Sequence, residues 1–231
     1  MRIVGGTHRG RRLPARLPPG VRPTSDRVRE AIFDILGSMG GVQGTSVIDL
    51  FCGSGAMGIE AASRGAGSVT FVDCDSRAIE AVRENLAYLG ITIERNSGFV
   101  GSLELAASLP APGLSGRVDP GRNPELDPER DAGRVAAVAI SGDVLCRRLP
   151  EWISDTSGFD VAFCDPPYDF DDWVRLLDHL KANVAILESN RTIDAPLGWN
   201  VDKTRRYGGT LVTVARSTST RSLLFDSATR R

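Results

Sequence analysis

The sequence predicts an α/β fold in which an open, mainly parallel sheet has helices on both faces. Short apolar segments typical of buried strands alternate with segments of helical periodicity along most of the chain. A glycine-rich turn, GSGAMG at 53–58, directly follows the first of these apolar segments. Aspartates stand at the ends of several apolar segments, which is where parallel sheets place their ligand sites.

The first helix is expected to begin after Thr24 or Ser25 and to end near Gly37, and its apolar residues have helical spacing. Further helices are expected at about 57–64, 76–89 and 170–182. Buried strands are expected at 46–51, 68–73, 135–141, 160–165 and 183–189. Two more strands within 201–216, around Tyr207-Gly208-Gly209, predict a C-terminal antiparallel hairpin and a seven-stranded sheet.

Charge and proline content divide the chain further. Residues 1–23 form an expected basic arm, and the first 30 residues have a net charge of +6 in a chain whose net charge is −1. This asymmetry is typical of an extension that binds phosphate groups. The main domain is expected over 24–216, interrupted at 95–134 by a proline-rich, acidic and mobile insertion, and 217–231 is expected to be a disordered polar tail.

Composition excludes several classes of protein. No apolar run approaches the roughly 18 residues of a membrane span. The first residues lack the apolar core of a signal peptide. The four cysteines form no CxxC pair and the chain has two histidines, so we expect no metal site and reduced thiols in a cytoplasmic protein.

The turn after the first strand predicts a nucleotide-cofactor site. Gly53, Gly55 and Gly58 satisfy GxGxxG, and Asp73 lies at the end of the next strand, so a dinucleotide also fits this spacing. Asp49, which precedes the glycines, is unfavourable beside a pyrophosphate. It suits the positively charged amino and sulfonium groups of S-adenosylmethionine.

Asp73 is predicted to accept hydrogen bonds from ribose hydroxyls, which both cofactor classes possess. Asp143, expected just after the third buried strand, is predicted to accept from the adenine amino group. The neighbouring Phe51, Ser54, Cys74 and Val144 are expected to line the same site.

The tetrapeptide Asp165-Pro166-Pro167-Tyr168 predicts transfer to an exocyclic amine of a nucleobase. The amine lone pair is delocalised into the ring, so a carboxylate (Asp165) and a carbonyl (Pro166), each accepting one N–H, would draw the nitrogen towards tetrahedral geometry. The two prolines restrict the backbone and remove competing donors. Tyr168 offers a ring on which a flipped base can stack.

Taken together, these motifs resemble those of the RsmD-type methyltransferases, which modify guanine N2 in bacterial small-subunit ribosomal RNA. The resemblance covers 2–90 and 141–216. It rests on IVGGTHRGRRL (3–13), RPTSDRVREAIFDIL (22–36), DLFCGSGAMGIEAASRGA (49–66), FVDCD (71–75), DPPY (165–168) and RRYG (205–208).

The resemblance implies a Rossmann-like class I fold, a methyltransferase domain over 24–216, and S-adenosylmethionine as the methyl donor. It implies that Thr24 and Glu30 contact the cofactor. The expected partner is 16S rRNA or a small-subunit assembly particle, with no membrane partner and a monomeric enzyme. The arginines that we expect to bind RNA phosphates are Arg9, Arg11, Arg12, Arg22, Arg27 and Arg29.

Other functions remain open at this level. The tetrapeptide also suits adenine N6 or cytosine N4. A non-catalytic RNA-binding assembly factor could retain the fold, although the intact motifs argue against it. A protein-glutamine methyltransferase usually has Asn first in the tetrapeptide and a helical substrate domain ahead of it, which this chain lacks. A dinucleotide-dependent oxidoreductase gives the tetrapeptide no role.

Overall fold

The computed structural model describes residues 1–14, 25–95, 138–149, 153 and 158–219. Thr24 and Arg22, nearly all of the expected insertion and most of the expected tail lie outside these residues. Among the described residues, no helix is both long and apolar enough to cross a membrane.

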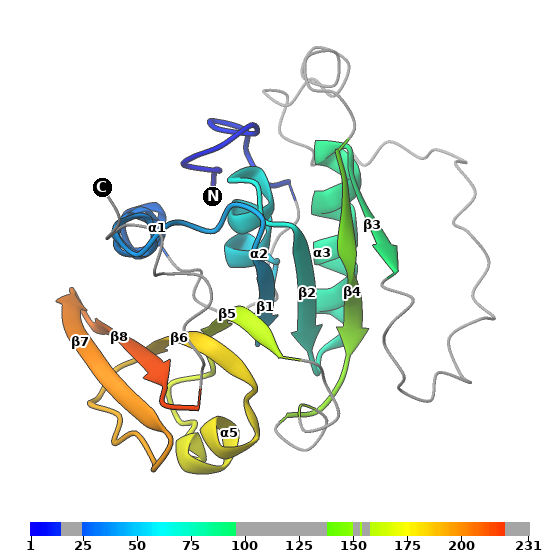
Figure 1. The fold of residues 1–231 in the computed structure, drawn as a ribbon. Helices are drawn as coiled ribbons and strands as arrows, with labels where there is room; N and C mark the ends of the chain where they lie inside the picture. The colour runs from blue at the N-terminus through cyan, green and yellow to red at the C-terminus, as the bar shows by residue number, and fades with distance from the viewer. Residues whose placement is uncertain (15–24, 96–137, 150–152, 154–157, 220–231) are drawn as a thin grey trace.

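The described helices are α1 (Asp26–Ser38), α2 (Ala56–Ser63), α3 (Ser76–Leu89) and α5 (Trp173–His179). The first four strands are β1 (Ser46–Leu50), β2 (Ser68–Asp73), β3 (Ile91–Arg95) and β4 (Val138–Cys146). The others are β5 (Phe159–Cys164), β6 (Ala182–Ser189), β7 (Trp199–Tyr207) and β8 (Thr210–Ser217). Figure 1 shows how they alternate along most of the chain.

The eight strands of the described residues form one sheet, in the order β3-β4-β2-β1-β5-β6-β8-β7. Every neighbouring pair from β3 to β6 is parallel, whereas β8 pairs antiparallel with both β6 and β7. The expected parallel sheet and C-terminal hairpin are therefore present. The expected count of seven strands was one too low, because β3 forms an additional edge strand beside β4.

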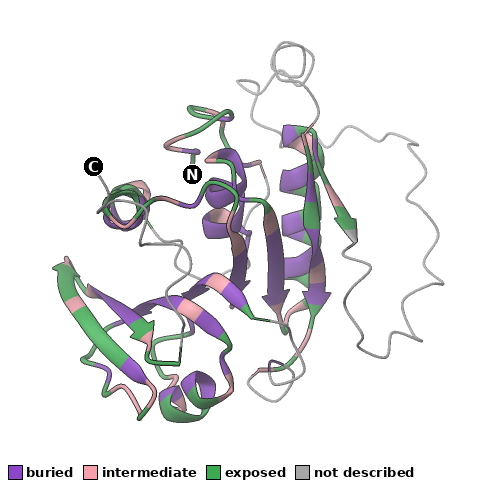
Figure 2. Ribbon diagram, in the orientation of Figure 1, coloured by how far each residue is buried: buried purple, intermediate pink, exposed green. Residues whose placement is uncertain are grey.

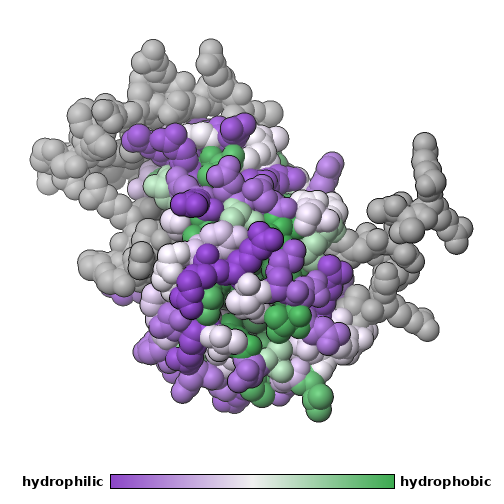
Figure 3. Space-filling view, turned by 90° about the vertical axis from the view of Figure 1, so that its left-hand side faces the viewer, coloured by the Kyte–Doolittle hydropathy of each residue, from purple (hydrophilic) through white to green (hydrophobic). Residues whose placement is uncertain are grey.

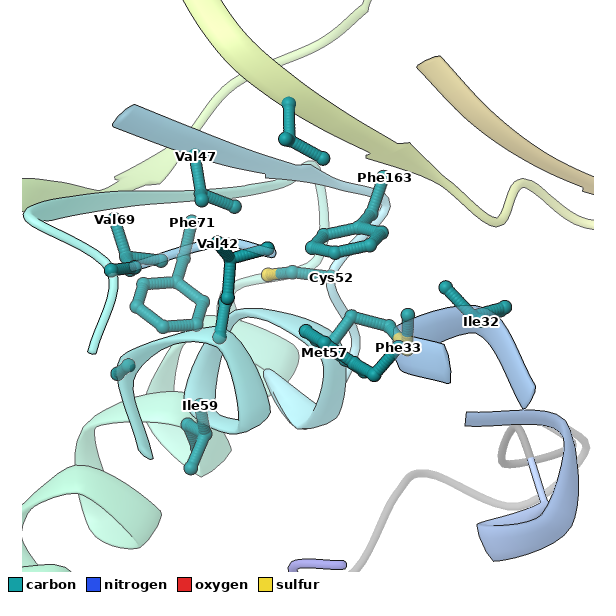
Figure 4. Packing of buried hydrophobic residues seen from close by; sticks show 14 of the residues in the cluster. Ile32, Phe33, Val42, Val47, Cys52, Met57, Ile59, Val69, Phe71 and Phe163 are labelled. Atoms are coloured by element: carbon teal, nitrogen blue, oxygen red, sulfur yellow. The ribbon is translucent and has the colours of Figure 1, made fainter. Parts of the chain in front are cut away.

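Helices lie on both faces of the sheet. One apolar cluster joins α1, α2 and α3 to one face, and a second joins α5 to the other. In the first cluster, Phe33 of α1 packs against Phe163 of β5 with ring centroids 5.5 Å apart, next to Met57 of α2 (Figure 4). The central strands β1, β2 and β5 are largely buried, whereas the edge strand β7 is mostly exposed (Figure 2).

Local capping explains where two helices begin. Ser25 caps α1, because its side chain accepts a hydrogen bond from the Val28 N–H. Asp75 caps α3 by accepting from the Arg77 N–H, and Gly90 ends that helix with φ +71°. The predicted limits of these two helices are thus confirmed to within about one or two residues.

The third predicted strand is longer than the sequence indicated. β4 continues to Cys146, so Asp143 and Val144 lie inside the strand, and Asp143 pairs with Thr70 of β2. The β4 residue level with Asp73, at the carboxyl edge, is Cys146. The expectation that Asp143 follows this strand is therefore wrong.

Candidate active site at the carboxyl ends of the strands

The turn between β1 and α2 is tightly curled. Phe51 has φ +58°, and Gly53 and Gly55 have φ +53° and +78°. The Gly55 N–H donates to the Cys52 carbonyl at 2.7 Å, which closes the turn. A bulky residue in the left-handed region is strained, and such strain is concentrated at functional sites.

Asp49, near the end of β1, is hydrogen-bonded to the start of α2 across this turn. It is 3% exposed, and its Oδ2 accepts the Gly58 N–H at 2.8 Å. Burial raises the pKa of the Asp49 carboxyl well above its ordinary value, and the nearby carboxylates Asp165 and Asp73 raise it further, against the lowering effect of the Gly58 hydrogen bond. The site therefore favours a cationic ligand, which would relieve this unfavourable charge.

Gly58 permits the close approach of α2 to the sheet. A Cβ at this position would lie 2.3 Å from the ring of Phe71 on β2. The third glycine of the GxGxxG pattern is therefore required for packing between helix and strand.

Asp73 ties two turns together at the end of β2. Its Oδ2 accepts the Gly53 N–H at 3.0 Å, and its Oδ1 accepts the Asp75 N–H at 2.9 Å. A carboxylate oxygen has more than one acceptor site, so both oxygens can also accept from a ligand hydroxyl. Asp73 thus shapes the glycine turn and presents acceptor capacity beside it.

The tetrapeptide begins where β5 ends. Asp165 is half-buried, Pro166 is buried, and Pro167 and Tyr168 are exposed. The Pro167 carbonyl accepts the Phe170 N–H at 2.9 Å, which turns the segment back. Phe170 then packs edge-on against Phe51, with centroids 5.4 Å apart, so the two turns contact each other.

Tyr168 forms a hydrogen bond with the C-terminal hairpin. Its hydroxyl lies 3.2 Å from the Thr210 Oγ1, at the start of β8, while the ring remains 41% exposed. An exposed ring with a fixed hydroxyl can offer a stacking surface without first losing rotamer freedom.

Two cysteines are buried beside the site. Burial raises the pKa of the Cys52 and Cys164 thiols well above the ordinary value, and Asp49 raises both further. Both thiols are therefore protonated at neutral pH, which gives no support to thiolate chemistry.

The structure brings most of the predicted cofactor residues to one edge of the sheet. These are Asp49, Phe51, Gly53, Ser54, Gly55, Asp73 and Cys74, together with the tetrapeptide predicted to be catalytic. Asp143 and Val144 do not reach this edge, since they lie three and two residues before the end of β4. Glu30 is exposed on α1.

The predicted RNA contact at Arg29 is contradicted. Arg29 is 1% exposed, its Nε lies 3.4 Å from Oε2 of the fully buried Glu60, and it also pairs with Asp26. Its guanidinium further donates to the Arg2 carbonyl. Because Arg29 neutralises a buried carboxylate, it is not available to phosphates.

The described part of the arm packs on the body instead of extending from it. Ile3, His8 and Leu13 are buried, and Ser63 of α2 accepts the Thr7 N–H through its carbonyl and the His8 N–H through its Oγ. α2 returns antiparallel to β1, so Ser63, at its carboxyl end, lies at the edge of the sheet opposite Asp165 (Figure 1).

The arm arginines differ in exposure. Arg9 and Arg12 are exposed, as is Arg27 on α1. Arg11 is partly buried, because its guanidinium lies over the Tyr88 ring at 5.1 Å and donates to the Tyr88 carbonyl. The arginines of this arm therefore lie apart from the tetrapeptide.

Sequence reasoning missed two groups, one that joins the arm to α1 and α2 and one that contacts the tetrapeptide. Glu60 pairs with both Arg29 and Arg64 and accepts the Val4 N–H at 2.9 Å, so it joins the arm, α1 and α2. An acid within the apolar stretch MGIEAA was the available signal. Thr210, the partner of Tyr168, directly follows the RRYG segment and Gly209, and no pattern marked it.

Comparisons with known proteins agree with this arrangement. Residues 1–107 match the family model described as conserved hypothetical protein 95. The chain is 44% identical over 89 residues to ribosomal RNA small subunit methyltransferase D of Escherichia coli, covering 38% of this chain and 44% of that protein. The chain thus spans about half the length, or less, of the curated relatives it matches at this identity.

Solved structures extend the similarity of fold along the chain. The yhhF protein of Escherichia coli superposes with a TM-score of 0.61 at 23% identity, covering 94% of this chain and 97% of that one. Magnesium protoporphyrin IX methyltransferase from Synechocystis, solved with S-adenosylmethionine bound, gives a TM-score of 0.50 at 12% identity over 83% of this chain and 79% of its own. The fold is therefore that of the class I methyltransferases. The resemblance predicted from the sequence is confirmed: this chain is similar to the RsmD family, whose model its first 107 residues match.

Proposed function

We propose that this protein is an S-adenosylmethionine-dependent methyltransferase that methylates the exocyclic N2 amine of a guanine in 16S rRNA of the small ribosomal subunit. The observation that carries the proposal is the contact between Phe51 of the strained glycine turn and Phe170, which lies two residues beyond the Asp165–Tyr168 tetrapeptide. This contact brings an anionic cofactor site and an amine-binding tetrapeptide together at one edge.

The residues of the glycine turn suit S-adenosylmethionine. Asp49 is a buried carboxylate with other acids nearby, so a cationic ligand is favoured there and a pyrophosphate is not. Asp73 retains acceptor capacity for hydroxyls beside Gly53. When bound, S-adenosylmethionine supplies an electrophilic methyl group.

The tetrapeptide supplies the groups that an exocyclic amine requires. Asp165 and the Pro166 carbonyl accept the two amine N–H groups and so hold the nitrogen in the geometry of a nucleophile. Tyr168 stacks on the flipped base, a contact worth about 1–3 kcal/mol. Positioning accounts for much of the barrier reduction, and several kcal/mol are available from that source alone.

The choice of 16S rRNA guanine rests on the 44% identical relative, whose name specifies the small-subunit ribosomal RNA, and on the RsmD-type segment at 22–36. Asp143 and Val144 are not included in the proposed cofactor site, because they lie within β4.

Analysis of the product nucleoside tests this function. Small-subunit particles that lack guanine-N2 methylation are incubated with the protein and labelled S-adenosylmethionine, and the RNA is digested to nucleosides. We expect label in N2-methylguanosine. Label in N6-methyladenosine or N4-methylcytidine would retain the chemistry and overturn the target, and absence of label would contradict the enzymatic function.

A further inference from the structure

The outer strand of the C-terminal hairpin is strongly basic and leads to the candidate site. β7 contains Lys203, Arg205 and Arg206, and no described residue forms an ion pair with any of the three. The fourth basic residue of the hairpin, Arg216 on β8, is paired with Asp202. The hairpin therefore presents a net positive charge on an edge of the sheet, and it shares this side of the molecule with α1. Hydrophilic side chains are prominent over this side (Figure 3).

The register of the hairpin places these charges at the carboxyl edge of the sheet. Arg205 is opposite Val212 and Tyr207 is opposite Thr210 on β8. Thr210 in turn holds the hydroxyl of Tyr168. The last residues of β7 are therefore connected to the catalytic tetrapeptide through one pair of strand neighbours and one hydrogen bond.

The register also separates the two faces of β7. Residues directly opposite each other share a face, as Thr204 and Thr213 do with hydroxyl oxygens 3.0 Å apart. Lys203 and Arg205 are opposite Val214 and Val212, which belong to the apolar cluster on the α1 face. Arg206 is opposite Leu211, so it projects from the other face.

The face that contains Lys203 and Arg205 is the face of the reacting groups. Val47, Val161 and Phe163 all belong to the apolar cluster on the α1 side of the sheet. Asp49 lies two residues after Val47 on β1, so its side chain is on the same face of the sheet, and Phe163 is its neighbour on β5. Asp165 comes directly after the end of β5, and its charge acts on Asp49. Tyr207 packs against the same cluster. A line of two cations and a tyrosine thus runs for about 13 Å along β7 towards Tyr168.

We propose that Lys203 and Arg205 form a phosphate-binding track for the RNA strand that contains the target base. This inference rests on the proposed function and assigns to the hairpin the substrate contacts nearest the reaction. Arg205 is exposed, Lys203 is partly exposed, and neither forms an ion pair with a described residue. Phosphates are the partners that such cations favour. The described part of the N-terminal arm cannot serve in their place, because it packs against Ser63 at the opposite edge.

Two adjacent arginines provide a matched test. Arg205→Ala and Arg206→Ala remove equal charge from neighbouring positions of one strand, but from opposite faces. Binding of a fluorescein-labelled RNA stem-loop is measured at several salt concentrations. We expect Arg205→Ala to weaken binding about five-fold at 0.1 M salt and to lower the salt slope by about 0.7. Arg206→Ala should have a much smaller effect.

An equal loss of RNA affinity in both variants would indicate general charge attraction and would overturn the face-specific track. Wild-type RNA affinity in Arg205→Ala would also overturn it. Arg205→Gln and Lys203→Gln, which remove the charge but keep a polar side chain with the same first three carbons, repeat the test if an alanine variant does not fold. S-adenosylmethionine affinity, unchanged in all variants, verifies folding. Methyl transfer by the wild-type protein is assayed separately, so failure of the proposed function is distinguished from failure of the track.

Discussion

Asp49 is a deeply buried acid at the proposed cofactor site. It is 3% exposed and lies on β1, just before the strained turn at Phe51. The Gly58 N–H donates to one of its oxygens, and burial is the largest cause of its raised pKa. A structural cap would suffice to explain the hydrogen bond, but the surrounding acids make the carboxylate costly unless a cation binds beside it.

The raised pKa of Asp49 makes both the stability of the fold and the binding of a cationic ligand depend on pH. The native state holds the proton more tightly than the unfolded chain, so the stability contribution of this group falls as pH rises from 3.8 through the raised pKa. A cationic ligand stabilises the ionised form and lowers the pKa. Binding is therefore accompanied by proton release over the same pH range.

We predict that S-adenosylmethionine affinity increases with pH through the raised pKa of Asp49, and that Asp49→Asn weakens binding and flattens this dependence. Titration calorimetry in buffers of different ionisation enthalpy measures the proton release directly. Asp178→Asn, at an exposed position of α5, serves as the control. Unaltered pH dependence in Asp49→Asn would show that this carboxyl does not respond to the cofactor.

Individual residues were predictable where their role depends on neighbours in sequence. The glycine turn, Asp73 and the tetrapeptide were located from their motifs, and the structure brings them to one edge. Arg29 was misassigned because its role depends on Glu60, which lies 31 residues away in sequence. Charge alone does not reveal a buried partner.

At the scale of elements, the junction of the arm, α1 and α2 depends on one buried carboxylate. Glu60 is fully buried and accepts from Arg29, Arg64 and the Val4 backbone. The Arg64 guanidinium also lies over the Phe33 ring at 4.7 Å. This network fixes α1 over the sheet, and α1 contributes Phe33 to the packing around β5.

Removing the charge of Glu60 should therefore destabilise the fold. We expect Glu60→Gln to lower the free energy of unfolding by about 3–5 kcal/mol, because Arg29 would lose its buried counter-ion and keep only the partly exposed Asp26. Urea denaturation measures the change, with Glu84→Gln on the exposed face of α3 as the control. A loss below about 1 kcal/mol, typical of an exposed pair, would contradict the structural role.

Element limits were predicted well where capping and periodicity agree, as in α1 and α3. They were predicted poorly in β4, because Gly142 and Asp143 are residues that usually end strands. The structure requires glycine at 142, since a Cβ there would lie 1.9 Å from the Val69 carbonyl oxygen. β3 was missed because its five residues end in Glu94-Arg95, at the border of a proline-rich stretch.

At the scale of the whole molecule, basic residues occur at both edges of the sheet. Arg9 and Arg12 belong to the arm at the amino edge, whereas Lys203 and Arg205 lead towards Tyr168 at the carboxyl edge. β1, which runs from the amino edge to the carboxyl edge, is about 17 Å long. An RNA must therefore extend along the molecule to contact both.

This separation predicts a dependence on substrate size. Arg9→Ala combined with Arg12→Ala should weaken binding to small-subunit particles and lower the salt slope, while binding of a short oligonucleotide and kcat change little. Arg83→Ala, an exposed arginine on α3, is the control. Equal weakening for the oligonucleotide and the particle would place the arm beside the target base instead.

The fold class and sheet topology followed from the alternation of strands and helices, and seven of the eight strands were expected. The placement of the arm could not be read from sequence, because the buried positions of Ile3, His8 and Leu13 depend on contacts with distant helices. Composition indicated a basic extension, but the structure packs its first residues on α2.

In the proposed function, the acids and the tetrapeptide at the carboxyl edge perform methyl transfer to an exocyclic amine. The most direct measurement compares transfer of labelled methyl groups and cofactor affinity in Asp165→Ala and in Asp169→Ala, an exposed aspartate just beyond the tetrapeptide. The structure predicts that Asp165→Ala loses transfer and retains cofactor affinity, whereas Asp169→Ala keeps both. Transfer at the wild-type rate by Asp165→Ala would contradict the proposed role of the tetrapeptide.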